Sequence, residues 1–145
     1  MSTPPPSYTL EFYEDPSGRA PVRDWLDDLP ENKRAAALAG LRHVLGRLGL
    51  EVCRTEYGKQ LGKGLAEFRL RHREDVILGK FASERPSRRR GKEKILLRVF
   101  FHAHGDRLIL LLAAYDKGRY PSPRRQEKEI AAARVRLREW RGRSK

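Results

Sequence analysis

The stretch Ile95-Leu96-Leu97-Arg98-Val99-Phe100-Phe101 decides the fold, because it sets one arginine inside an otherwise apolar run. A short apolar run rich in β-branched and aromatic residues predicts a central β-strand. A guanidinium buried in such a strand without a partner costs several kcal/mol. We therefore expect Arg98 to face a cleft, a carboxylate or a phosphate.

The charge distribution favours phosphate as the partner of Arg98. The chain of 145 residues has a net charge of +13. Residues 1–53 carry 6 basic and 8 acidic side chains, whereas residues 54–145 carry 26 basic and 11 acidic ones. This asymmetry predicts that one half of the molecule binds a polyanion. We expect nucleic acid rather than a membrane, since no predicted helix pairs a basic face with a large aromatic face.

Length and composition predict one soluble, cytoplasmic domain over residues 8–140, between a flexible lead (residues 1–7) and a basic tail (residues 141–145). Cys53 is the only cysteine, so no disulfide framework or zinc cluster is expected. The N-terminus lacks the basic and apolar regions of a signal peptide. The longest apolar run, Leu108 to Tyr115, is too short to span a bilayer.

Further strands are predicted on both sides of the central one. Residues 107–115 form a hairpin with residues 95–102 through the turn at residues 103–106. Upstream, Ala66, Phe68 and Leu70 alternate with Glu67, Arg69 and Arg71, which predicts a strand with one core face and one charged face. A fourth strand covers residues 8–13.

Three helices are predicted around this sheet. The first begins near Pro21, the second follows Pro30 and ends near Gly49, and the last covers residues 124–140. The second should bury the stripe Leu38, Leu41, Leu45 and Leu48. Residues 74–94 read as a basic loop. The order predicts an α+β fold with an N-terminal strand, an αα-hairpin, a largely antiparallel sheet and a C-terminal helix.

The residues that share the charged face suit chemistry on RNA. Strand parity places Arg98 and His102 on one face, which Arg69 and Arg71 join if the strands pair. The set of Arg, Lys, Tyr and His, without a carboxylate pair or metal-ligand spacing, suits cleavage of RNA by its own 2′-hydroxyl. Guanidinium groups would stabilise the phosphoryl charge. A Lys or Tyr of lowered pKa, or His102, would act as base.

Structural interpretations stay open beside the chemical one. Arg98 could form an ion pair with Glu67 on the neighbouring strand, and Arg69 and Arg71 could form a solvated strand face. His102 could be an exposed turn residue. From Lys117 to Lys145 the chain has 11 basic and 3 acidic residues, which fits a solvated helix face or contact with an RNA backbone.

Several segments in this order resemble the RelE/HigB toxin superfamily, in particular its phage-derived HigB-like branch. They are Phe12 to Asp15, Pro21 to Pro30, Leu61 to Arg69, Leu97 to Phe101 and Leu111 to Lys117, followed by Pro123, Glu129-Ile130 and Ala133. Together they cover most of residues 8–140. The resemblance implies a RelE/ParE-like fold.

The resemblance also implies a function. Such toxins belong to type II toxin–antitoxin modules, and they typically cleave mRNA in the ribosomal A site without a metal or other cofactor. The expected partners are mRNA on the ribosome and a HigA-like helix-turn-helix antitoxin, in a hetero-oligomer. By position, Arg69, Arg98 and Lys117 match the family's basic catalytic residues. The predicted RNA contacts are Arg71, His102, Tyr115, Arg119, Tyr120, Arg88, Arg89 and Arg90.

The chain departs from the family pattern at two places. Gly118 follows Lys117, where relatives commonly have a second lysine, and Arg119 is the candidate substitute. Residues 74–94 form an insertion where relatives usually have a short turn. Two other functions stay open: a ParE-like inhibitor of DNA gyrase, and a non-catalytic nucleic-acid-binding module. Retention of Arg69, Arg98 and Lys117 argues against the gyrase inhibitor.

Overall fold

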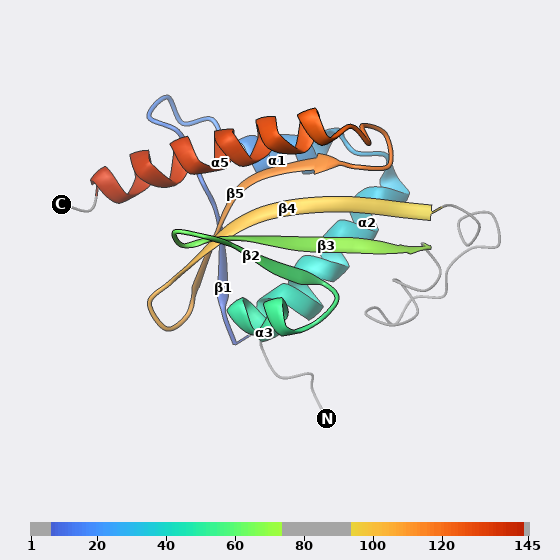
Figure 1. The fold of residues 1–145 in the computed structure, drawn as a ribbon, viewed down its shortest axis with the longest axis horizontal. Coiled ribbons are helices and arrows are strands. Elements are labelled where there is room, and N and C mark those ends of the chain that lie inside the picture. Colours follow the sequence, from blue (N-terminus) through green and yellow to red (C-terminus); the bar gives the residue numbers. More distant parts are fainter. Residues whose placement is uncertain (1–6, 74–93, 144–145) are drawn as a thin grey trace.

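Five strands form one sheet in the order β1-β5-β4-β3-β2. The computed structural model describes residues 7–73 and 94–143 (Figure 1). The strands are β1 (Thr9–Phe12), β2 (Gly58–Gly62), β3 (Leu65–Arg73), β4 (Lys94–His104) and β5 (Leu108–Asp116). The helical elements are α1 (Pro21–Asp28), α2 (Glu31–Gly40), η1 (Leu41–Leu45), α3 (Gly46–Leu48), η2 (Gly49–Arg54) and α5 (Pro123–Arg143).

The predicted central strand is confirmed. β4 lies in the middle of the sheet and pairs antiparallel with β3 and β5, and only β1 runs parallel to its neighbour, β5. The α+β class, the largely antiparallel sheet and the C-terminal helix are therefore confirmed. No helix in the part of the chain described is long and apolar enough to cross a membrane.

Helices cover the two faces of the sheet unequally. On one face, α1, α2 and η1 bury a large apolar core against alternate residues of β3 and β4, among them Phe68, Leu97, Val99 and Phe101. Of the described helices, only α5 packs on the other face, through Ala133 and Leu137, against residues that include Leu65, Phe100 and Leu110. Figure 1 shows α5 running along one side of the sheet, over β5. The face that α5 shares with β3 and β4 is the one that carries the charged side chains.

A bulge in β5 determines which face its last residues join. Phe100 pairs with Ala113 while Phe101 pairs with Leu111, so Leu112 is an extra residue on β5. An extra residue reverses the alternation beyond it. Tyr115 therefore packs in the same cluster as Leu110, on the side of α5. Unbroken alternation would have placed Tyr115 on the opposite face.

Two expectations were wrong in detail. Residues 58–62, expected only as a glycine-punctuated connection, form the edge strand β2. In the second predicted helix, Leu38 and Leu48 are 41% and 36% exposed, and the buried side consists of Ala36, Ala37, Leu41, Val44 and Leu45. The helical run is not one regular α-helix, because η1 between α2 and α3 is a π-helical turn, so a single α-helical period does not describe its buried side. Gly49, with φ of +54°, ends α3 as predicted, and the 3₁₀ helix η2 begins at the same residue. A Cβ at Gly49 would lie 2.4 Å from the ring of Tyr8.

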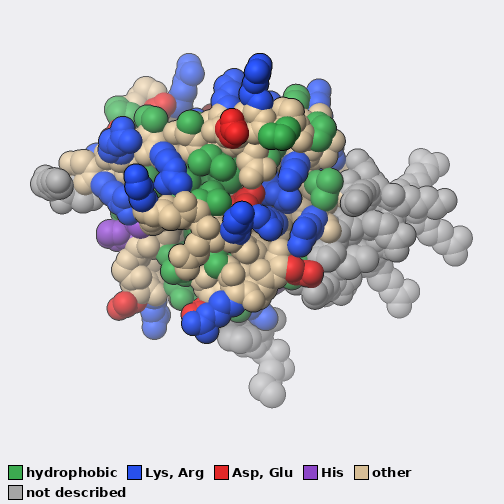
Figure 2. Space-filling model, viewed as in Figure 1, with side chains coloured by type: hydrophobic (Ala, Val, Ile, Leu, Met, Phe, Trp, Pro, Cys, Tyr) green, Lys and Arg blue, Asp and Glu red, His purple; other side chains and the backbone are tan. Residues whose placement is uncertain are grey.

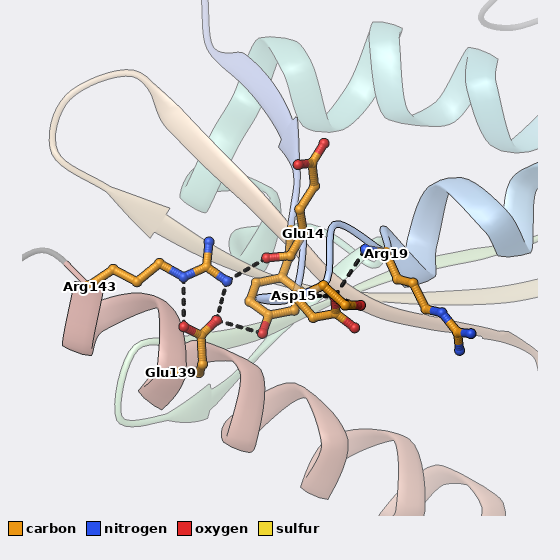
Figure 3. Close-up of polar contacts among 7 residues, drawn as sticks. Glu14, Asp15, Arg19, Glu139 and Arg143 are labelled. Atoms are coloured by element: carbon orange, nitrogen blue, oxygen red, sulfur yellow. Dashed lines mark hydrogen bonds and ion pairs between the residues drawn. The ribbon is translucent and has the colours of Figure 1, made fainter.

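The end of α5 is fastened to the segment after β1 by a polar cluster (Figure 3). The hydroxyl of Tyr13 donates to Glu139 Oε1 at 2.7 Å, and Arg143 Nε donates to Glu139 Oε2 at 2.6 Å. Arg143 Nη2 also donates to the carbonyl oxygen of Glu14 at 2.6 Å. Burial, together with the bond to Glu139, raises the pKa of Tyr13 to about 12.

Replacement of Tyr13 by Phe should therefore destabilise the protein by about 1 kcal/mol at pH 7, the usual value of one such hydrogen bond. Because the pKa of Tyr13 is raised from the ordinary value near 10, the protonated hydroxyl stabilises the fold fully below pH 10. This contribution is lost as pH rises from about 10 to about 12. Urea unfolding at several pH values should show the difference between wild type and Tyr13→Phe shrinking across that window.

Tyr120→Phe is the matched control for this measurement, because Tyr120 is 40% exposed. We expect it to change the free energy of unfolding by less than about 0.5 kcal/mol at every pH. A difference between wild type and Tyr13→Phe that stayed constant up to pH 12 would contradict the bond to Glu139.

Candidate functional site

Three predicted site residues lie side by side across the sheet. Arg69 of β3 pairs with Arg98 of β4, and Arg98 pairs with Tyr115 of β5. Arg71 lies one step further along the same face of β3, and Lys117 follows β5 directly. We call Arg69, Arg71, Arg98 and Lys117 the cationic cluster. Figure 2 shows Lys and Arg side chains gathered over α5 and over the sheet beside it, with few carboxylates among them.

A single buried carboxylate lies at the centre of this cluster. Glu67 is 1% exposed, and its Oε2 accepts a hydrogen bond from Arg69 Nε at 3.1 Å. Its Oε1 lies 3.2 Å from Arg98 Nε. That second contact is an ion pair without hydrogen-bond geometry, and neither of its two atoms has a hydrogen-bond partner among the residues described. The structure therefore contains the Glu67–Arg98 pair that the structural interpretation anticipated, and adds Arg69 to it.

The cluster keeps an excess of positive charge next to solvent. One carboxylate faces two guanidinium groups, whose side chains are 24% exposed for Arg69 and 6% exposed for Arg98. Arg71 is exposed and Lys117 is half-buried. Burial lowers the pKa of Lys117, and the positive charge of Arg98 lowers it further. The amine of Lys117 is thus easier to deprotonate than an ordinary lysine.

Tyr115 lies beside Arg98 of the cationic cluster, but its hydroxyl already makes a hydrogen bond. The side chain is buried, and its hydroxyl donates to Gln126 Oε1 of α5 at 3.1 Å. Burial raises the pKa of Tyr115. Tyr115 therefore stays protonated, which does not favour it as a base.

The turn after β5 is held by a buried ion pair that the sequence did not reveal. Lys33 Nζ of α2 lies 2.6 Å from Asp116 Oδ2. Asp116 Oδ1 also accepts a hydrogen bond from the backbone N–H of Arg119 at 3.2 Å. Lys117, between Asp116 and Gly118, is thereby fixed beside the sheet. The sequence shows Asp116 as an acidic residue at the end of an apolar strand, but this pattern does not identify Lys33 as its partner.

Arg119 does not take the place of a second lysine in the cluster. Its guanidinium carbon lies 5.4 Å from the centre of the Tyr120 ring, and the side chain is exposed. The guanidinium carbon of Arg125, on α5, lies 4.3 Å from the centre of the same ring. Arg119 and Tyr120 form a separate group beyond the end of β5.

His102 shares the face of Arg98 as predicted, but it lies apart from the cluster. Four residues along a strand separate them by about 13 Å. His102 is 7% exposed, its Nδ1 lies 2.7 Å from the carbonyl oxygen of Gly64, and the Trp140 ring packs edge-on against it. The alternative of an exposed turn residue is wrong. Burial lowers the pKa of His102, as expected for a histidine held within the fold.

Besides Arg143, three basic residues of α5 donate hydrogen bonds to backbone carbonyl oxygens. Arg134 Nη2 donates to the carbonyl oxygen of Leu61 at 2.9 Å, Arg136 Nη1 to that of Leu112 at 2.8 Å, and Arg141 Nη1 to that of Lys63 at 3.4 Å. Part of the positive charge of this helix therefore holds α5 against β2, the turn that follows β2, and β5. Neither interpretation from the sequence, a solvated face or an RNA contact, included this use.

The predicted contacts Arg88, Arg89 and Arg90, and residues 74–93 of the predicted insertion, lie outside the described residues. In the described part of the chain, no group of three or more His, Cys, Asp and Glu side chains could hold a metal ion. Comparison of the chain with family models, with curated proteins and with solved structures gave no match.

Replacement of Glu67 by Gln should cost about 3 kcal/mol of unfolding free energy, because it leaves Arg98 buried without a counter-charge. Arg98→Met in the same chain should recover at least 1 kcal/mol of that loss, which a double-mutant cycle in urea would measure. Glu129→Gln, which breaks the Arg125–Glu129 pair on α5, is the control and should cost less than about 1 kcal/mol. Additive effects of the two replacements would contradict a coupled pair.

Proposed function

We propose that this protein is the toxin of a type II toxin–antitoxin module, a RelE/HigB-like endoribonuclease that cleaves mRNA on the ribosome without a metal. One observation carries the proposal: Arg69 and Arg98 face each other across β3 and β4, next to Lys117 with its lowered pKa. The resemblance of the sequence places catalytic residues at these same three positions. The α+β fold is compatible with a RelE/ParE-like arrangement.

In the proposed reaction, the 2′-oxygen of one nucleotide attacks the adjacent phosphorus and the 5′-oxygen leaves. Negative charge grows on the phosphoryl oxygens, which Arg69 and Arg98 stabilise. Glu67 acts as a positioning residue, because it binds the Nε atom of both arginines and so orients their terminal nitrogens. The departing 5′-oxygen takes a proton from water, so the products are a 2′,3′-cyclic phosphate and a 5′-hydroxyl end.

Lys117 is the base in this scheme. A neutral amine is needed to take the proton of the 2′-hydroxyl, and the lowered pKa of Lys117 increases the neutral fraction near pH 7. Tyr115 and His102, the other candidates, are less suited. The pKa of Tyr115 is raised, and His102 lies about 13 Å along the strand from Arg98.

The proposed partners follow from the substrate and from the resemblance. A strongly basic surface suits mRNA and the ribosomal RNA around it. A HigA-like helix-turn-helix antitoxin would neutralise the toxin in a hetero-oligomer, and the site of action would be the cytoplasm. A ParE-like gyrase inhibitor would have no use for the assembled cationic cluster.

A non-catalytic nucleic-acid-binding module is the second candidate, and a specific observation favours it. The Arg98 side chain is only 6% exposed and is paired with Glu67, as in a structural ion pair. In that case the basic surface would bind RNA in a salt-sensitive way and no strand would be cut.

The first test is to induce wild type, Lys117→Met and Arg98→Lys in cells and to map new 5′-hydroxyl ends in mRNA. Arg98→Lys keeps the charge opposite Glu67, so the fold should survive, but it loses the bidentate geometry. We expect new ends inside translated codons for wild type, and at least a 100-fold loss for both variants. The control is Arg47→Ala, which changes an exposed residue of α3 and should cleave mRNA like wild type. Growth arrest without new ends would favour the gyrase-inhibiting function. The absence of both growth arrest and new ends would favour the binding module.

The second test uses pH. Because Lys117 works as the neutral amine, single-turnover cleavage of ribosome-bound mRNA should rise with pH and level off above the pKa of Lys117, which is lower than the 10.5 of an ordinary lysine. In Lys117→Arg the cleavage rate should fall at least 100-fold and should no longer rise with pH, since a guanidinium stays protonated. The same pH dependence in wild type and in Lys117→Arg would exclude Lys117 as the base.

A further inference from the structure

A second basic hollow lies next to the cationic cluster, where the chain passes from β5 into α5. Its volume is about 450 Å³, within the range of about 300–1,000 Å³ that small-ligand sites occupy. It is lined by Tyr120 and Pro121, and by the cations Arg119, Arg124, Arg125 and Lys128. A smaller hollow shares Pro121 with it and is lined also by Lys117, Gln126 and Glu127.

The lining combines a flat aromatic surface with positive charge. Tyr120 is 40% exposed although the guanidinium groups of Arg119 and Arg125 lie over its ring, so part of the ring remains open. None of the described residues that line this hollow is acidic. A ligand with a planar ring and a negatively charged group fits both features, because rings stack on tyrosine and arginine while the anion meets the cations.

The hollow is also held in shape before any ligand arrives. Glu129 Oε2 accepts a hydrogen bond from Arg125 Nε at 2.9 Å, and the Arg125 guanidinium carbon lies 5.9 Å from the centre of the Tyr115 ring. The backbone N–H of Tyr120 donates to the carbonyl oxygen of Asp116 at 2.9 Å, and Lys33 fixes Asp116 in turn. A pre-formed surface loses less entropy when it binds.

We infer that this hollow binds one unpaired nucleotide of an RNA strand, with its base against Tyr120 and Arg125 and its phosphate on the surrounding cations. The choice of RNA rests on the proposed function, and Pro121, which lines both hollows, connects this subsite with the hollow at Lys117. Base stacking tolerates any sequence, so this subsite holds the strand in place rather than reading a codon.

The test measures binding separately from cleavage. The probe is a pentanucleotide with 2′-O-methyl groups throughout, which lacks the attacking hydroxyl, and with a central 2-aminopurine whose fluorescence falls when it stacks. The comparison strand has an abasic site at that position. The purified full-length chain is used as wild type, Tyr120→Phe and Tyr120→Leu, with Arg42→Ala, an exposed residue of η1, as the charge control.

We expect wild type and Tyr120→Phe to quench the 2-aminopurine and to bind it about tenfold more tightly than the abasic strand. Tyr120→Leu should lose both the quenching and the tighter binding of the 2-aminopurine strand, while it keeps the thermal stability of wild type. Arg42→Ala should quench and bind as wild type does. Equal binding of both strands by wild type, or full quenching by Tyr120→Leu, would overturn the subsite. Quenching by a protein that cuts no mRNA on the ribosome would overturn the nuclease proposal and support the subsite alone.

Discussion

The buried carboxylate of Glu67 is the interaction on which the charged half of the sheet depends. Arg98 occupies the middle of a central strand, where an unpaired guanidinium would be too costly, and Glu67 compensates it from the neighbouring strand. The same carboxylate also binds Arg69, so one negative charge serves two positive ones. This face of the sheet therefore has a net positive charge where it meets solvent, which is the property that a phosphate-binding surface requires.

The position of that net positive charge depends on how helices cover the sheet. Among the helices described, α1, α2 and η1 close one face, whereas α5 alone packs on the other, mainly against β5 and β4. Arg134, Arg136 and Arg141 hold α5 in this place through backbone carbonyl oxygens, and Arg143 fastens its end near Tyr13. Part of the high positive charge is thus structural, and net charge alone overstates how much of it is available to RNA.

The cationic cluster and the hollow at Tyr120 are linked by the chain between them. Lys33 and Asp116 hold the end of β5, and Arg125 contacts the rings of both Tyr115 and Tyr120. A strand of RNA lying on this surface would meet guanidinium and amine groups first and an aromatic platform next. Attraction between backbone phosphates and cations, and stacking of bases on aromatic rings, are the two interactions that bind single-stranded RNA without regard to its sequence.

The sequence by itself determined the α+β class, the central strand and the shared face of Arg98 and His102, because alternation along a strand is a local property. The pairing of Arg69 with Arg98 needed the register of two strands, which the tertiary structure supplied. It also identified Glu67 as a candidate partner of Arg98. Only the tertiary structure decided that Tyr115 joins this face, since one extra residue in β5 reverses the alternation. The Lys33–Asp116 pair, the burial of His102 and the place of Arg119 over Tyr120 were equally beyond the sequence. Each of them depends on contacts between segments far apart in the chain, or on how a turn directs its side chains, and local patterns contain neither.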